Sequence, residues 1–269
     1  MRKIRKIIRC CLLLLVIGFT CSIAYSFYLG QNTIDANHHT IEINDLPSEF
    51  ENFKIGFISD VHLNQKNSVD KLIKITSIVN KQDFDMLIFG GDLYDVSPFE
   101  QSKVIETLSS MQSKYGKFAI LGEKDITYST QEMIMSGGFE IIQNDVRTIY
   151  KNGQSIYFIG AYSENLQPLM SDEIKNGIAF VANHEPDFFG STKYLDIDFQ
   201  LSGHSLGGVV NLPFYGPLFK VDGAKTYAND KFVENDKTLI ISDGLGLETK
   251  HKFRLFTKNQ IEVITLTQS

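Results

Sequence analysis

One apolar run of the chain turns abruptly polar at its end: Phe53-Lys54-Ile55-Gly56-Phe57-Ile58-Ser59-Asp60-Val61-His62. Five further short apolar runs follow it, at Met86–Phe89, Phe118–Leu121, Ile156–Ile159, Ile178–Val181 and Phe199–Leu201. Runs of this length are typical of buried β-strands. Between them, residues 68–80 and 99–112 carry apolar side chains at helical spacing, so the alternation predicts an α/β fold.

The C-terminal part of the chain has a different pattern. Apolar runs at Thr238–Ile241, Phe253–Phe256 and Ile261–Leu266 follow one another with no helical segment between them. Parallel strands need a long crossover connection, usually a helix, whereas antiparallel strands do not. We therefore expect a mixed or antiparallel portion to close the fold.

Polar residues that can bind metal ions stand directly after the apolar runs. Asp60 and His62 follow the first run and Asp92 follows the second, while His184 and His204 follow two later runs. The carboxyl ends of strands in an open α/β sheet form the ligand crevice, so we expect these side chains to converge. Carboxylates and imidazoles without cysteine suit Mn, Fe or Zn, and two such ions can clamp a phosphoryl group during its transfer. Asp92 has two carboxylate oxygens and could bridge the two ions.

The charge of the chain is unevenly distributed. Residues 1–30 hold five bases and no acid, which leaves 21 bases against 32 acids in the other residues, a formal charge of −11. Nucleic-acid affinity comes from Lys and Arg side chains that neutralise phosphates, so we expect no nucleic-acid partner for a domain this acidic. All three cysteines lie within the first 21 residues, which excludes a disulfide or a cysteine zinc site in the domain.

The N-terminal segment is long and apolar enough to cross a membrane. Residues 10–29 carry no formal charge, and a helix of that length spans the roughly 30 Å hydrocarbon layer. A cleaved signal peptide is the alternative, but no clear small-x-small cleavage site precedes Tyr25. Five bases precede the stretch and the next base is Lys54, so the positive-inside rule predicts a single-pass protein of the cell membrane with an extracytoplasmic domain. We expect an anchor at 1–30, a tether at 31–45 and the domain at 46–269.

In these motifs and their order, the sequence resembles the calcineurin-like metallophosphoesterases, in particular their membrane-attached bacterial branch. The ordered blocks of that family are D-x-H, G-D-x-x-D, G-N-H-D/E, a lone histidine after a strand, and G-H-x-H. The corresponding segments here are Asp60-Val61-His62, Gly91-Asp92-Leu93-Tyr94-Asp95, Gly122-Glu123-Lys124-Asp125, His184 and Gly203-His204-Ser205-Leu206. The resemblance extends from about Phe53 to Leu266 and implies a two-sheet β-sandwich flanked by helices.

The resemblance implies a ligand set for one or two divalent ions per chain. Asp60, His62 and Asp92 would hold the first ion. Asp92 would bridge to a second ion that His184 and His204 also hold. Asp95 would support these ligands without binding an ion.

Three positions depart from the family pattern. Glu123 replaces the asparagine ligand and can still offer an oxygen to the second ion. Lys124 replaces a family histidine that donates a proton or contacts phosphate. Lys124 and its neighbour Asp125 are the residues expected to take part in catalysis. An ammonium with a pKa near 10.4 is a poor acid at neutral pH. Leu206 replaces the second histidine of G-H-x-H and cannot bind a metal, so we expect the first ion to bind more weakly.

The sequence leaves three functions open. The first is a metal-dependent hydrolase with weakened activity on a phosphomonoester or phosphodiester, its substrate a phosphorylated small molecule or a lipid-linked phosphoester. The second is an inactive protein that binds a metal or a phosphate. The third is a serine esterase, because Ser205 lies in a G-x-S-x-G match and Asp243 and His251 follow it in triad order. That motif needs a helix directly behind the serine, and residues 209–217, with two prolines, do not predict one.

Overall fold

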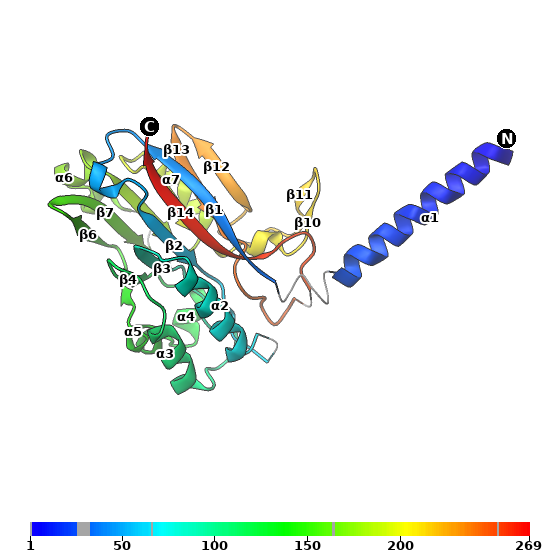
Figure 1. Cartoon of the computed structure of the whole chain (residues 1–269), viewed down its shortest axis with the longest axis horizontal. Coiled ribbons are helices and arrows are strands. Elements are labelled where there is room, and N and C mark those ends of the chain that lie inside the picture. The colour runs from blue at the N-terminus through cyan, green and yellow to red at the C-terminus, as the bar shows by residue number, and fades with distance from the viewer. Residues whose placement is uncertain (1, 26–32, 66, 163–164, 252) are drawn as a thin grey trace.

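A long N-terminal helix projects from a domain built on two large β-sheets (Figure 1). The computed structural model describes residues 2–25, 33–65, 67–162, 165–251 and 253–269. Helix α1 (Arg2–Tyr25) buries none of its side chains against the domain. It is the one helix in the described part of the chain that is long and apolar enough to span a membrane.

The first sheet is mixed and has the strand order β1-β14-β2-β3-β4-β5. Its strands are β1 (Ile34–Ile43), β14 (Asn259–Gln268), β2 (Lys54–Ile58), β3 (Met86–Phe89), β4 (Lys117–Ala119) and β5 (Glu140–Ile141). All neighbours pair in parallel except β14 and β2, where Ile264 lies opposite Ile55 in an antiparallel register. β14 is the last strand of the chain; it lies between β1 and β2 and runs antiparallel to β2.

Three helices cover the outer face of this sheet: α2 (Val69–Lys81), α3 (Gln101–Ser109) and α5 (Gln131–Ser136). Leu72, Ile75 and Val79 lie on one side of α2 at helical spacing, and all three are fully buried. They belong to a hydrophobic cluster that also contains Leu87 of β3 and Val263 of β14. Burial of such an apolar stripe holds a surface helix on its sheet.

The second sheet has the order β12-β13-β9-β8-β7-β6. Its strands are β12 (Asp230–Glu234), β13 (Lys237–Ile241), β9 (Phe199–Ser202), β8 (Ala179–Asn183), β7 (Gln154–Ala161) and β6 (Asp145–Lys151). The four central strands run parallel, and the two edge strands pair antiparallel to their neighbours. The parallel strands β8 and β9 bring their carboxyl ends to one edge of the sandwich.

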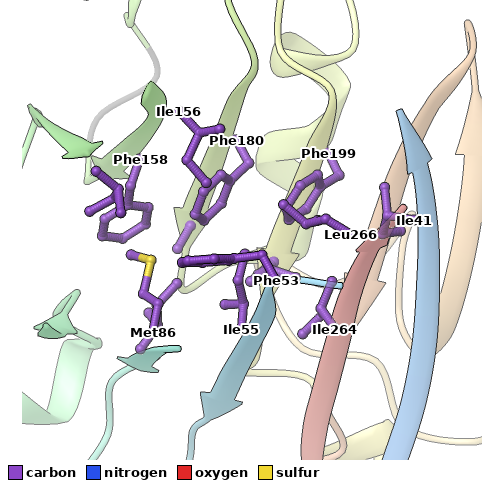
Figure 2. Close-up of a cluster of buried hydrophobic side chains, with 14 of the residues drawn as sticks. Ile41, Phe53, Ile55, Met86, Ile156, Phe158, Phe180, Phe199, Ile264 and Leu266 are labelled. Atoms are coloured by element: carbon purple, nitrogen blue, oxygen red, sulfur yellow. The ribbon is translucent and has the colours of Figure 1, made fainter. Parts of the chain in front are cut away.

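The main core lies between the two sheets (Figure 2). Phe158, Phe180 and Phe199 come from three adjacent strands and stack in a row, with ring centroids 5.2 and 4.8 Å apart. Ile264 and Leu266 of β14 approach them from the first sheet. Each fully buried side chain of this kind contributes about 1.5–3 kcal/mol.

The remaining elements are short. They are α4 (Glu123–Thr127), α6 (Asp172–Lys175), α7 (Phe189–Thr192), the 3-10 turns η2 (Ser48–Phe50), η3 (Gln167–Leu169), η4 (Pro186–Phe188) and η5 (Leu206–Gly208), and the hairpin strands β10 (Asn211–Leu212) and β11 (Gly216–Pro217). Several of them lie directly after strands of the two sheets, where they carry the polar residues of the predicted motifs.

The predicted sandwich of two sheets flanked by helices is confirmed, but two segments differ from expectation. Most of the expected tether at 31–45 is strand β1, which pairs with β14 along ten residues. Residues 31 and 32, and the expected end of the anchor at 26–30, lie outside the described residues. The expected strand Phe253–Phe256 is a loop with an isolated bridge from Leu255 to Val210, because Arg254 turns inward to bind backbone carbonyls.

Candidate metal centre

Four loops from the carboxyl ends of strands meet at one point between the two sheets. Asp60 and His62 follow β2, Asp92 follows β3, His184 follows β8 and His204 follows β9. Ligand atoms of Asp60, His62 and Asp92 lie within 4.8 Å of one another, and so do those of Asp92, His184 and His204. The expected convergence is therefore present, and Asp92 belongs to both groups.

An unusual backbone conformation aims four of these side chains. Asp60, His62, Asp92 and His204 have φ angles of 52°, 45°, 61° and 66°. This left-handed region is uncommon for residues with a Cβ and persists where the surrounding structure enforces it. Here adjacent strand ends enforce it, because the Asp60 amide donates to the Gly91 carbonyl at 2.9 Å and the His62 amide donates to the Asp92 carbonyl at 3.1 Å.

Two glycines allow the carboxylates to pack against the neighbouring backbone. A Cβ on Gly122 would collide with Oδ1 of Asp92, and a Cβ on Gly203 would collide with Oδ2 of Asp60. The close approach lets the Lys124 amide donate to Asp92 Oδ1 at 2.9 Å and the His204 amide donate to Asp60 Oδ2 at 3.0 Å. One oxygen of each carboxylate is thus fixed, and the other is left for the centre of the site.

Backbone carbonyls orient two of the histidines. Nδ1 of His184 donates to the Gly90 carbonyl at 2.7 Å, and Nε2 of His204 donates to the Asp222 carbonyl at 2.7 Å. The opposite ring nitrogen of each faces the centre and would offer its lone pair to a bound metal ion. Histidines that bind metals commonly hold their second nitrogen in this way.

The donor set fits a divalent cation. Asp60 Oδ1 and His184 Nε2 are buried, and neither has a hydrogen-bond partner within the described ranges. His184 Nε2 makes no hydrogen bond although it lies 3.4 Å from Asp92 Oδ2. Buried polar atoms in proteins are normally paired, so unpaired donor atoms that converge on one point are suited to holding a cation.

The electrostatics of the site also favour a positive charge at its centre. Burial alone would raise the pKa of Asp60, but His184 and His62 outweigh it and hold that pKa below its ordinary value. Burial opposes the charged form of His184, yet Asp92 and Asp60 raise the pKa of His184 to about 10. The two carboxylates therefore stay ionised and hold a proton on His184, and a bound metal ion would release that proton.

Of the three residues that begin α4, Glu123 and Asp125 differ in position from expectation. Glu123, predicted as a ligand, lies outside both groups; its side chain is 59% exposed, with Oε1 3.0 Å from the Lys124 ammonium. Lys124 also lies 3.6 Å from Glu248. Burial opposes its charge, but the ion pair with Glu123 and the charge of Glu248 raise the pKa of Lys124 to about 12. Lys124 therefore stays protonated in neutral solution.

Asp125, predicted to be catalytic, is fully buried beneath the site. Its carboxylate accepts the amides of Asp92 at 2.7 Å, Leu93 at 3.0 Å and Gly122 at 3.0 Å, together with the Thr130 hydroxyl. These contacts join the start of α4 to the Asp92 loop. They give Asp125 a positioning role, because a side chain without exposure cannot touch a substrate.

Asp95 and Leu206 lie at the borders of the centre. Asp95 accepts the backbone amide and the hydroxyl of Thr249, which fixes the loop after β13 rather than a ligand side chain. Leu206 is 3% exposed and packs in an apolar cluster with Val209, Val210, Leu247 and Leu255. A Cβ on Gly244 would touch both Asp60 and Leu206, so Leu206 stands beside the first ligand group.

The geometry gives little support to a serine esterase. Ser205 is followed by the three-residue turn η5, and its hydroxyl accepts the Gly207 amide at 3.2 Å. His251 lies 3.6 Å from Glu248, and no hydrogen bond joins His251 to Ser205 or to Asp243 in the described structure. The helix behind the serine and the relay to a base are both missing.

Several residues that support the site have no motif. Asn64 and Asn67 both donate to the His62 carbonyl and to the Leu247 carbonyl. Arg254 is fully buried and donates to the carbonyls of Asp243, Gly246 and Lys258. Together they hold the loop after β13 against the ligand loops. Their partners are backbone oxygens, which leave no signal in a sequence.

Two cavities open on the centre. One, of about 260 Å³, is lined by His184, Glu123, Tyr162 and Glu185. The other, of about 180 Å³, is lined by His204, Glu248, Lys250 and Phe219. Polar groups on both sides of the second ligand group therefore have room to meet a substrate.

Comparison with known proteins agrees with this geometry. Residues 53–208 match the model of the calcineurin-like phosphoesterase family. An uncharacterized metallophosphoesterase of Bacillus subtilis, YkuE, is 29% identical over 257 residues, covering 90% of this chain and 88% of the relative. The phosphodiesterase YaeI of Escherichia coli is 23% identical over 225 residues, 80% of this chain and 82% of the relative. The solved structure of an archaeal phosphodiesterase covers 73% of this chain and 88% of that protein, with a TM-score of 0.40 and 15% identity. The family match spans more than half of the chain and contains all five converging residues, so this protein belongs to the calcineurin-like phosphoesterase family.

Proposed function

We propose that this protein is a metal-dependent hydrolase of a phosphomonoester or phosphodiester. The observation that carries the proposal is the pair of ligand groups that share Asp92. A carboxylate common to two groups can bridge two ions, and two ions a few ångströms apart are suited to an in-line displacement at phosphorus. Family membership supports the same reaction class.

Asp60, His62 and Asp92 would hold one ion, and Asp92, His184 and His204 would hold the other. Mn, Fe and Zn suit a set of carboxylates and imidazoles without sulfur. Bound ions would supply Lewis acidity to a phosphoryl oxygen and lower the pKa of a water molecule. The chain itself holds the ligands in place through the Gly90 and Asp222 carbonyls and through the amides that fix Asp60 and Asp92.

Lys124 would bind a phosphate oxygen rather than donate a proton. With a pKa raised to about 12, its ammonium keeps its proton through the neutral range. It lies at the border of the site with 22% of its side chain exposed, within reach of an anionic ligand. Activity is then expected to be low, because a general acid contributes about 10²–10⁴-fold where one is present.

An inactive metal-binding or phosphate-binding protein is the second candidate. Leu206 favours it, because an apolar side chain stands beside the first ligand group where the family has a histidine. Glu123 also favours it, because its carboxylate turns to Lys124 instead of the ligand groups. The two candidates differ in turnover, because only the hydrolase would convert the phosphoester that it binds.

Hydrolysis of p-nitrophenyl phosphate and bis(p-nitrophenyl) phosphate by the full-length chain tests the proposal. We expect activity that requires Mn, disappears with a chelator and is lost in Asp92→Ala, while Ser205→Ala retains it. Chelator-insensitive activity that is lost in Ser205→Ala would instead support the esterase. A chain that binds Mn and hydrolyses neither ester would support the inactive protein.

We also propose that α1 anchors the domain to the cell membrane in a single pass, with the domain on the extracytoplasmic side. An 18-residue window within its 24 residues has a mean hydropathy of 2.4, and the hydroxyls of Thr20 and Ser22 donate to carbonyls within the helix. Satisfied hydroxyls lower the cost of inserting polar residues into lipid. A membrane partner and a lipid-linked phosphoester substrate would follow from this location. Resistance to alkaline extraction and digestion of the domain by external protease test it, and recovery of a soluble chain shortened at its N-terminus would favour a signal peptide.

A further inference from the structure

A group of exposed apolar side chains borders the candidate metal centre. Phe214 at the tip of the β10–β11 hairpin is fully exposed, and Tyr215 beside it is 75% exposed. Leu218 and Phe219, which follow in the chain, and Phe256 in the loop after β13 are about half-exposed. We call this set the aromatic rim: Phe214, Tyr215, Leu218, Phe219 and Phe256. Exposed aromatic groups of this kind mark an interaction surface more often than isolated exposed residues do.

Backbone pairing joins the parts of the rim to each other. Val210 and Leu255 form a parallel bridge, and the Asn211 amide donates to the Leu255 carbonyl at 2.9 Å. The loop at 253–258, which carries Phe256, therefore supports the base of the hairpin. The rim also borders the 180 Å³ cavity, because Phe219 lines that cavity together with His204.

The rim lies on the side of the domain where the chain arrives from α1 (Figure 1). Asn259, directly after the 253–258 loop, donates to the Thr33 carbonyl at 2.9 Å. The seven residues between Tyr25 and Thr33 span at most about 30 Å even when fully extended. An anchored α1 would therefore keep the rim close to the bilayer, while β6 lies at the opposite edge of the second sheet.

The charge of the rim segments differs from that of the rest of the domain. Residues 211–221 and 249–258 contain five bases and no acid, although residues 31–269 together have a formal charge of −11. Arg254 is one of the five and is buried, and the other four are lysines. Lys250 pairs with Glu248, and Lys258 pairs with Asp35 at 2.8 Å, so acids of the neighbouring segments partly neutralise this charge. Aromatic side chains beside lysines match the headgroup region of an anionic membrane.

We propose that the aromatic rim docks on the surface of the same bilayer that α1 crosses, with Phe214 and Tyr215 inserted at the level of the headgroups. This inference rests on the proposed membrane anchor and is independent of the metal centre. Docking gives the domain a fixed orientation and places the cavity lined by His204 and Phe219 at the lipid surface. The exposure of the aromatic side chains and the short connection to α1 favour lipid over a protein partner.

The absence of tryptophan from the chain makes a direct test possible. Phe214→Trp introduces a single fluorophore at the rim, and Tyr150→Trp introduces one on β6, where Tyr150 is 70% exposed. Each full-length variant is reconstituted into vesicles of phosphatidylcholine and phosphatidylglycerol, with and without bromine on the lipid acyl chains. We expect brominated lipid to quench the fluorescence of Trp at position 214 by about twofold or more and to leave position 150 nearly unchanged.

Flotation of the same samples separates the possible failures. A chain that floats with the vesicles but shows no quenching at position 214 would overturn the docking inference alone. A chain that does not float would overturn both the anchor and the docking. Asp92→Asn added to Phe214→Trp is expected to keep the quenching, since the rim does not depend on the metal ligands.

Discussion

The two ligand groups share Asp92, yet the protein surrounds them differently. We call Asp60, His62 and Asp92 the closed group, because they are at most 2% exposed. Leu206 lies near this group on the side of Gly244 and also lines the cavity beside His204. The second group reaches solvent, because His184 and His204 each line a cavity. We therefore expect a phosphoester to reach the two ions from the side of the open group, which is made up of Asp92, His184 and His204. The missing histidine thus falls on the closed group.

The largest effect should come from the residue that the two groups share. Asp92→Asn is expected to reduce hydrolysis by about 10³-fold or more, because both ions lose a ligand. His62→Ala and His204→Ala each disrupt one group and should cost less, about 10²-fold. Steady-state rates with a nitrophenyl ester provide the comparison. Equal losses in all three variants would contradict a shared role for Asp92.

Restoring the histidine that the family has at position 206 should strengthen metal binding by the closed group. Leu206→His is expected to raise the affinity of the closed group for Mn by about tenfold or more, because one imidazole is added beside Asp60. Leu206→Met is the matched control, since it keeps an apolar side chain of similar volume. Calorimetric titration of Mn into the metal-free chains measures the change. The idea fails if the His and Met variants bind Mn with the same affinity.

A smaller effect should follow from loosening the support beneath Asp92. In Asp125→Asn, one carboxylate oxygen becomes an amide NH₂ that faces backbone N–H donors. We expect a loss of about 1–3 kcal/mol in the free energy of unfolding and a fall in activity of about tenfold. Thermal unfolding and hydrolysis are measured together, with Thr127→Val on the exposed face of α4 as the control. Full activity in Asp125→Asn would remove its positioning role.

A last effect, on the pH dependence of stability, concerns Lys71, which lies away from both groups and should not affect the comparison between them. Burial, reinforced by the charge of Arg254, lowers the pKa of Lys71 from 10.5 to about 7. Between these two values the unfolded chain binds the extra proton and the folded chain does not, so this group makes stability rise as the pH increases from 7 to about 10. Denaturant unfolding should show that Lys71→Met loses this part of the rise, while exposed Lys74→Met keeps it. An unchanged pH dependence in Lys71→Met would refute the burial effect.

The contrast between strands shows what the sequence can predict about this fold. Met86–Phe89 was expected as a strand and is β3 with the same bounds, because four consecutive buried side chains make a continuous apolar run. Strand β1 has no such run, since polar residues such as His38 and Glu42 interrupt it. It forms because β14, more than 200 residues later, offers a free edge along which it pairs. Pairing between distant segments leaves no local pattern.

The site shows the same division. The five converging residues are predictable as a set because each follows the carboxyl end of a strand, where polar ligands gather. The sequence does not show that β2 and β3 belong to one sheet and β8 and β9 to the other. The direction of each side chain was not predictable, since it depends on left-handed backbone at Asp60 and Asp92 and on carbonyl partners such as Gly90. The positions of Glu123 and Asp125 also depend on how α4 packs, because its first turn points one carboxylate outward and buries the other.

The content of bound metal tests the central claim most directly. After dialysis of the full-length chain against Mn, elemental analysis is expected to find two ions per chain in the wild type and fewer than one in Asp92→Asn. Either of two results would contradict the account: no bound ion in the wild type, or the same number of ions in the wild type and in Asp92→Asn.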